Sequence, residues 1–219
     1  RADKRDEMLL TEASPLYTAY ADAAWATPFV FSVVGETVPD NTMTLHTLRD
    51  YIESYPPGVA PEAYFLWIDA EDPPPCVLVV LGVLLQLQWL TVDRWLEEDQ
   101  REATLLFPRY FELSLKNLDV HANTNMITTR TTRILVKRRI IVTIHGRHDQ
   151  VIADIQRQAN AHCTTEWVLY QVLHKTMLSC DGWVQRLKEE VDELIRFQEV
   201  NLRVDQLGFV ARTAQLNER

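Results

Sequence analysis

The sequence predicts an α/β fold that is followed by long helices. Short apolar runs rich in Val, Ile and Phe alternate with segments of helical period over residues 28–160. From Thr165 onward apolar residues recur every three or four positions, and no proline follows Pro108. We therefore expect an α/β domain over residues 1–164 and a long helical segment over residues 165–219.

The composition supports a globular domain and argues against two broad classes. Apolar residues make up 47% and charged residues 24% of the 219 residues, which is ordinary for a folded chain and excludes a disordered or collagen-like one. The 31 acids exceed the 22 bases, for a net charge of −9, which argues against a general nucleic-acid binder. Three scattered cysteines predict neither a disulfide framework nor a zinc knuckle, and favour a reducing compartment.

The N-terminal third predicts two strands and two helical stretches. Residues 1–27 are mixed in character but compatible with a helix, and residues 28–35 (PFVFSVVG) read as a strand that ends at a glycine. Residues 44–55 place apolar side chains at helical spacing, and a Pro-Pro-Gly stop follows them. Residues 64–70 (YFLWIDA) predict a second strand. The first residues are charged with no apolar block behind them, so we expect no signal peptide, and the start at Arg1 predicts a piece of a longer protein.

The most apolar segment runs from Cys76 to Leu90. It is shorter than the roughly 20 residues that a membrane-spanning helix needs, and it contains Gln86 and Gln88. Three prolines at 73–75 precede it, as at the start of many helices. We therefore predict a buried helix here and no membrane crossing within the sequence.

The second half of the predicted domain is richer in strands. Residues 107–115 (FPRYFELSL) predict a strand, and residues 117–129 a polar connection. Residues 131–145 predict a β-hairpin whose turn lies at residues 137–139, although the turn lacks the favoured Asn-Gly or Asp-Gly pair. Residues 148–160 predict a short helix.

The C-terminal segment carries an apolar seam with a mean spacing of 3.5 residues, which is typical of a coiled coil. The seam comprises Leu173, Met177, Cys180, Val184, Leu187, Val191 and Leu194. After Leu194 the phase slips and a looser helical stripe continues. Such a seam packs either within one chain or between subunits, and the spacing leaves both open.

The sequence contains none of the common motifs for nucleotides, redox cofactors or hydrolytic catalysis, and we predict that the chain is not an enzyme. One cluster could bind a hard divalent cation such as Mg²⁺, because such ions prefer carboxylate oxygens and retain water. The predicted metal ligands are Asp93, Glu97, Glu98 and Asp99. The alternative is a solvated helix face with local acid–base pairs, in which Arg94 and Arg101 take part.

Two further patterns have a functional and a structural interpretation. His145 and His148 could be two metal ligands, or a histidine at a strand end and one on the surface, since zinc requires further converging ligands. Residues 130–148 contain six Lys or Arg and no acid before Asp149. They could bind an anion or a lipid headgroup, or form a solvated hairpin whose charges prevent pairing between strand edges.

Five segments, in order, resemble the CorA-type family of magnesium and divalent-cation channels. YFLWIDA resembles the W-I-D strand of the family, and LTVDRWLEEDQRE its L-T-x-E-D-I-L stretch. FPRYFELSL resembles its F-x-x-Y-x-F strand, and RILVKRRIIVTIH its hairpin ending in V-T-V-H. VLYQVL and WVQRLKEEVDEL resemble its first long helix. The resemblance covers roughly residues 64–216.

The resemblance implies an α/β fold in which a mixed β-sheet lies between helix layers and is followed by long antiparallel coiled-coil-like helices. Its implied role is that of the cytosolic regulatory domain of a Mg²⁺ transporter, five copies of which surround a membrane pore on the cytoplasmic or matrix side. The resemblance also implies that Mg²⁺ bound between subunits closes the pore. The family's Gly-Met-Asn signature and two membrane spans are absent from this sequence, and Arg94 replaces one of the family's paired acids, so Glu97, Glu98 and Asp99 would relocate the site next to Asp93. The alternatives are a zinc-transporting relative of the same fold and a coiled-coil interaction protein that contacts no membrane.

Overall fold

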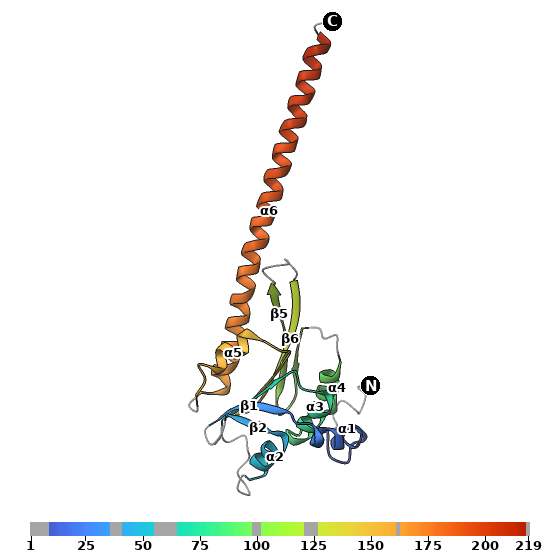
Figure 1. Cartoon of the computed structure of the whole chain (residues 1–219), viewed down its shortest axis with the longest axis vertical. Coiled ribbons are helices and arrows are strands. Elements are labelled where there is room, and N and C mark those ends of the chain that lie inside the picture. Colours follow the sequence, from blue (N-terminus) through green and yellow to red (C-terminus); the bar gives the residue numbers. More distant parts are fainter. Residues whose placement is uncertain are drawn as a thin grey trace. The chain divides into compact units, whose positions relative to one another are not determined.

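We analysed a computed structural model of the chain (Figure 1), which describes residues 9–35, 41–54, 65–97, 102–120, 127–160 and 163–217. The chain divides into two compact units, Arg1–Thr176 and Met177–Arg219. The long helix begins at Thr165. The division into domains at residue 164 stays a prediction.

The first unit is built on a seven-stranded mixed sheet in the order β2-β1-β3-β7-β6-β5-β4. The strands are β1 (Val30–Gly35), β2 (Thr42–Thr44), β3 (Leu66–Glu71), β4 (Ala103–Leu106), β5 (Phe111–Val120), β6 (Ile127–Lys137) and β7 (Ile140–His145). The helices are α1 (Pro15–Ala26), α2 (Leu45–Glu53), α3 (Pro75–Leu84), α4 (Trp89–Leu96), α5 (Gln150–Gln156) and α6 (Thr165–Asn217). Strands β3 and β7 are parallel, and the other neighbours in the sheet are antiparallel.

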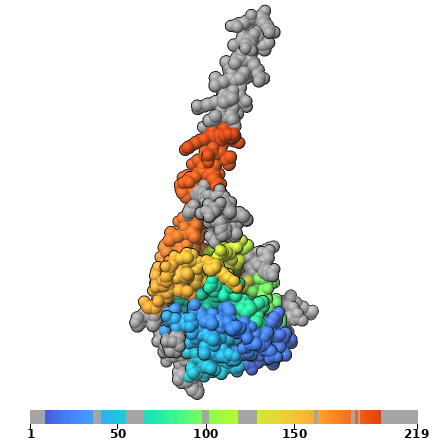
Figure 2. Space-filling view, viewed as in Figure 1, coloured from blue at the N-terminus to red at the C-terminus, as the bar shows by residue number. Residues whose placement is uncertain are grey.

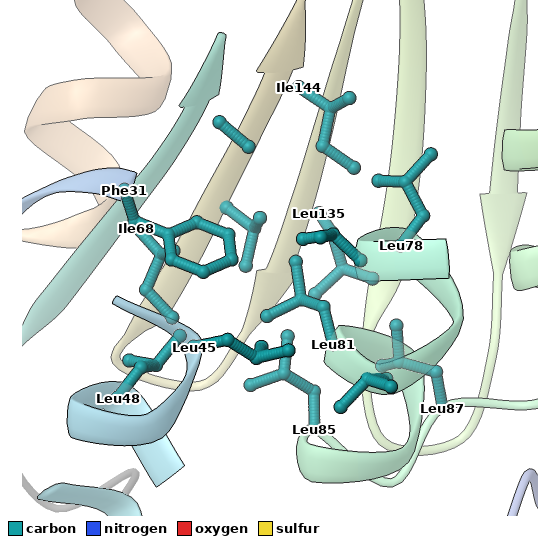
Figure 3. Packing of buried hydrophobic residues seen from close by; sticks show 14 of the residues in the cluster. Phe31, Leu45, Leu48, Ile68, Leu78, Leu81, Leu85, Leu87, Leu135 and Ile144 are labelled. Carbon is teal, nitrogen blue, oxygen red and sulfur yellow. The ribbon is translucent and has the colours of Figure 1, made fainter. Parts of the chain in front are cut away.

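One face of the sheet is covered by α1 to α4. The alternation along β3 directs Leu66, Ile68 and Ala70 into this core, where they meet the apolar helix α3. Figure 3 shows Leu81 of α3 next to Leu135 of β6, with Leu85, just after the helix, in the same cluster. In the space-filling view, the N-terminal elements through α2, blue to cyan, form a continuous part of the surface of this unit (Figure 2).

The opposite face is covered by α5 and the first turns of α6. Phe65 and Trp67, which alternate with the residues above, pack here with Ile141 of β7. Val168 and Val172 of α6 complete this second core. The sheet therefore lies between two helix layers, which confirms the predicted fold class.

The apolar run from Cys76 to Leu90 forms a buried helix that ends earlier than predicted. Helix α3 stops at Leu84, Gln86 adopts a positive φ of 53°, and the chain turns into α4 at Trp89. Within the part of the chain that the structure describes, none of the helices combines the length and apolarity that a membrane crossing requires.

Gly82 permits close contact between α3 and α4. A methyl group at this position would lie 2.3 Å from Cγ2 of Val92, which is fully buried and stiff because it is β-branched. We expect Gly82→Ala to lower the free energy of unfolding by about 1–2 kcal/mol, because overpacking exceeds the gain in helix propensity. Urea unfolding of the single variants and of Gly82→Ala/Val92→Ala measures their coupling. Strictly additive effects would contradict this contact.

Several local predictions need correction. Strands β2 and β4 were not expected, because three- and four-residue strands give too short an alternation to recognise. The polar connection predicted at residues 117–129 is largely strand, since β5 continues to Val120 and β6 begins at Ile127. The turn of the hairpin lies at Arg138 and Arg139, within the predicted range. Residues 165–217 form one helix, and the pairing of long helices stays a prediction.

Candidate functional site

The predicted metal ligands surround the C-terminal end of α4. Asp93 lies in the last turn of the helix, and Glu97 is its C-cap residue; both are exposed. Glu98 and Asp99 lie outside the described residues. Among the residues with described positions, no three His, Cys, Asp or Glu side chains are placed to hold a metal ion together. Asp93 and Glu97 alone form a sparse acidic surface that could hold an ion through water.

A buried tyrosine fixes the start of α4. The Tyr110 hydroxyl accepts a hydrogen bond from the backbone N–H of Gln88 (3.0 Å) and lies 2.7 Å from the hydroxyl of Thr91. The Tyr110 ring stacks on Phe107, with ring centroids 4.6 Å apart. The first N–H groups of a helix lack partners within the helix. The hydroxyl of Tyr110, a residue just before β5, therefore caps the N-terminal end of α4.

An arginine of β6 binds the other end of α4. Arg133 donates to the backbone carbonyl of Trp95 (2.9 Å) and to that of Glu97 (3.2 Å). The last carbonyls of a helix have no intrahelical partner and carry partial negative charge. A positive charge attached to the sheet therefore lies beside Glu97, one of the predicted metal ligands.

A buried carboxyl group belongs to the same cluster. Glu112 of β5 is 2% exposed, and its Oε1 accepts from the indole N–H of Trp95 (3.0 Å), while Oε2 has no partner among the described groups. Burial raises the pKa of Glu112, and the charges of Arg94 and Arg133 partly oppose this. Burial lowers the pKa of Arg133 to about 10, with the charge of Glu112 acting against it. Arg133 therefore remains charged at neutral pH.

The basic segment at residues 130–148 largely serves internal contacts. Arg130 donates to the carbonyls of Arg147 (2.6 Å) and His148 (3.1 Å). The ammonium of Lys137 donates to the carbonyl of Leu85 (2.8 Å) just after α3. Arg130 and Lys137 thus bind backbone carbonyl groups of the same unit. Neither interpretation of the segment predicted this role.

The opposite face of the sheet holds a buried polar network centred on Asp69. Its carboxylate accepts from the Thr143 hydroxyl, from His145 Nε2 (3.1 Å) and from the side-chain amide of Gln156 (2.7 Å). The Thr143 hydroxyl in turn accepts from the indole N–H of Trp67 (2.9 Å). The network joins β3, β7 and α5 without an unpaired polar atom at Asp69.

The protonation of His145 follows from its two neighbours. Nδ1 lies 2.8 Å from the carbonyl of Gly146 and Nε2 faces the Asp69 carboxylate, so both ring nitrogens face acceptors and both carry protons. Burial lowers the pKa of His145, but the hydrogen bond and charge of Asp69 outweigh it and raise the pKa to about 9. An imidazolium with both N–H groups engaged has no lone pair to coordinate a metal or to act as a base.

The other predicted residues are not brought together into one site. His148 is exposed at a positive φ of 61°, and its backbone N–H donates to Glu71 (2.8 Å). Its neighbour Arg147 pairs with Asp72 at 2.8 Å across the ends of β7 and β3. In α/β folds, ligands often bind at the edge where parallel strands end. Here the ends of β3 and β7 are joined by the Arg147–Asp72 ion pair and by the hydrogen bond from His148 to Glu71.

The predicted seam on α6 is exposed in the second unit. Its exposed members there are Met177, Val184, Leu187, Val191 and Leu194. Exposed apolar side chains at heptad spacing indicate a helical partner, but the spacing does not say which one.

The sequence did not single out Glu112 or Asp69, and it marked Arg133 only as one of the bases in the segment 130–148. One signal was present in the sequence. Arg133 and Lys137 lie two positions before and two positions after Leu135 in a strand, so all three side chains share one face of the sheet. A buried cation requires carbonyls or acids nearby, which predicts a structural contact but not its partner.

Comparison with known proteins places this geometry in a known fold. No family model matches the chain. The chain is similar to the soluble domain of CorA from Methanocaldococcus jannaschii, with a TM-score of 0.53 and 19% identity over 77% of this chain and 64% of that one. It is also similar to the cytoplasmic domain of ZntB from Vibrio parahaemolyticus, with a TM-score of 0.55 and 16% identity over 76% and 65% of the two chains. The full-length CmaX protein gives a TM-score of 0.57 and 17% identity over 75% and 49%.

One sequence relative adds to this. A protein of Schizosaccharomyces pombe described as a "putative metal ion transporter" is 24% identical over 134 residues, which cover 58% of this chain and 22% of that protein. The chain thus spans about half to two thirds of the structural relatives above and a smaller part of the yeast protein. The resemblance to CorA-type soluble domains is confirmed at the level of the fold.

Proposed function

We propose that this chain is the non-catalytic regulatory domain of a divalent-cation transporter, in which it senses Mg²⁺ and transmits the change to a membrane pore. The observation that carries the proposal is the fold likeness, over about three quarters of this chain, to the soluble domain of CorA and the cytoplasmic domain of ZntB. The yeast relative supports a role in metal-ion transport. The pore, the homo-pentamer and the placement on the cytoplasmic or matrix side belong to the same proposal.

The cation would bind through Asp93, Glu97, Glu98 and Asp99. The two described members are exposed around the end of α4, where an ion could keep most of its water and bind through it. Such binding is weak, which suits a sensor of a cation present at millimolar concentration. The chain's net charge of −9 adds a general attraction for cations.

A titration with matched charge variants tests the site. We expect the wild-type chain to bind Mg²⁺ in the millimolar range, measured by competition with Mn²⁺ in electron paramagnetic resonance at constant ionic strength. Asp93→Asn/Glu97→Gln should weaken binding about tenfold or more, because it removes both described carboxylates. Asp22→Asn/Asp50→Asn removes the same charge from exposed positions on α1 and α2 and should leave the affinity nearly unchanged. Equal effects of the two double variants would refute the site.

The alternatives make distinct predictions. A zinc-transporting relative of the same fold would give Zn²⁺ and not Mg²⁺ flux when the full-length protein is reconstituted in vesicles. A coiled-coil interaction protein would have neither membrane spans nor a Gly-Met-Asn sequence in its full length. Two apolar spans with that signature after residue 219 would favour the channel.

A further inference from the structure

The end of α4 has an unfavourable arrangement of charge. The C-terminal end of a helix carries partial negative charge, so cations stabilise it and acids destabilise it. Here Asp93 occupies the last turn and Glu97 the C-cap position. Behind them, the Glu112 carboxyl group is buried, and its Oε2 has no partner among the residues that the structure describes. The partial charge of the helix end and the carboxylates of Asp93 and Glu97 therefore favour a cation here, whereas the raised pKa of Glu112 disfavours its own charged form.

The protein supplies that cation itself. Arg133 reaches from β6 and donates one N–H to the carbonyl of Trp95 and another to that of Glu97. Arg133 is directly opposite Ser114 in the β5–β6 register, so it extends from the face of the sheet that also carries Glu112. Arg94 of α4 adds a second guanidinium whose charge acts on Glu112.

We propose that Arg133 is a tethered cation that competes with divalent ions for the end of α4 and keeps their affinity low. This inference rests on the proposed binding of Mg²⁺ at Asp93 and Glu97. A fixed positive charge that acts on Glu97 repels an incoming divalent ion, and the two hydrogen bonds of Arg133 hold the end of the helix without any ion. Arg133 is therefore a positioning residue that sets the concentration range to which the site responds.

The decisive variant removes the charge and keeps most of the side chain. We expect Arg133→Gln to tighten Mg²⁺ binding about tenfold, because one unit charge near a partly exposed site acts at this scale after screening by salt. The same variant should gain thermal stability on addition of millimolar Mg²⁺, whereas the wild type should gain little. Mn²⁺ electron paramagnetic resonance with Mg²⁺ competition gives the affinity, and a thermal melt gives the second readout.

Two control variants separate charge from structure. Arg130→Gln also removes a guanidinium that binds two backbone carbonyls, but it lies beside α5 and should leave Mg²⁺ affinity unchanged. Arg133→Lys keeps the charge while losing the planar fork, and should retain an affinity close to that of the wild type. Should Arg133→Gln not fold, Arg94→Gln provides the same test, with a smaller tightening expected.

The outcomes distinguish this inference from the proposed function. Tightening in Arg133→Gln but not in Arg130→Gln supports the tethered cation. If the wild type binds Mg²⁺ through Asp93 and Glu97 but Arg133→Gln and Arg94→Gln leave the affinity unchanged, the tethered-cation inference is overturned. The proposed Mg²⁺ site then remains intact. No binding of Mg²⁺ by any variant overturns the proposed site itself.

Discussion

Asp69→Asn is expected to lower the free energy of unfolding by about 3–5 kcal/mol, because it leaves the imidazolium of His145 buried without its counter-charge. Asp69 and His145 are 5% and 6% exposed, so water does not replace the lost partner. Thr143 and Gln156 also donate to this carboxylate and would face an amide instead. Urea unfolding followed by tryptophan fluorescence and far-UV circular dichroism measures the change.

A neighbouring acid provides the matched control for that variant. Asp72 also forms an ion pair, with Arg147 at 2.8 Å, but both side chains are more than half exposed. We expect Asp72→Asn to cost less than about 1 kcal/mol, since exposed pairs contribute little. Similar losses in Asp69→Asn and Asp72→Asn would show that burial does not determine the strength of the Asp69 pair.

The stability of the first unit is expected to fall by about 3 kcal/mol as the pH rises from 6.5 to 9 and beyond. The pKa of His145 is about 9 in the folded chain and 6.5 for an ordinary histidine, and each pKa unit corresponds to about 1.4 kcal/mol. Because the folded pKa is the higher one, this stabilisation is fully present below pH 6.5 and is lost as the pH rises through 9.

Unfolding curves at half-unit steps of pH, with a reductant present, measure this dependence. In Asp69→Asn the slope between pH 6.5 and 9 should largely disappear, because the carboxylate that raises the pKa of His145 is gone. Glu112 also has a raised pKa, but the loss that it causes begins at lower pH, near the ordinary range of a carboxyl group. A wild-type slope that persists in Asp69→Asn would assign the effect to another group.

The α/β domain could be predicted from the sequence, because near-continuous apolar runs within residues 64–70 and 131–145 mark strands buried on both faces. The layering of sheet and helices was implied by the family resemblance. The sequence was also sufficient to predict that the run from Cys76 to Leu90 is a buried helix, because both its length and its glutamines disfavour a membrane span. The break at Gln86 could not be predicted, because this residue adopts a positive φ of 53° without the glycine or asparagine that usually marks such a helix end.

The environment of the candidate site was harder to predict. Asp93 and Glu97 lie four positions apart in the sequence, so their proximity could be predicted. Arg94 could be seen next to Asp93. Arg133 lies 36 positions from Glu97, and no local pattern connects the two. Similarly, Asp69 and His145 lie 76 positions apart, so the partner that decides the charge of the histidine appears only once β3 and β7 are neighbours.

The parallel pairing of β3 with β7 also has a kinetic consequence. Strands β4 to β7 form an antiparallel meander whose neighbours follow each other along the chain. Asp69 and Thr143, by contrast, come from strands 74 positions apart, and closing so long a loop costs chain entropy before any contact compensates for it. We expect the meander to form early and the docking of β3 to be the slow step of folding. The Asp69 network would then act after the folding barrier, where it slows unfolding more than it speeds folding.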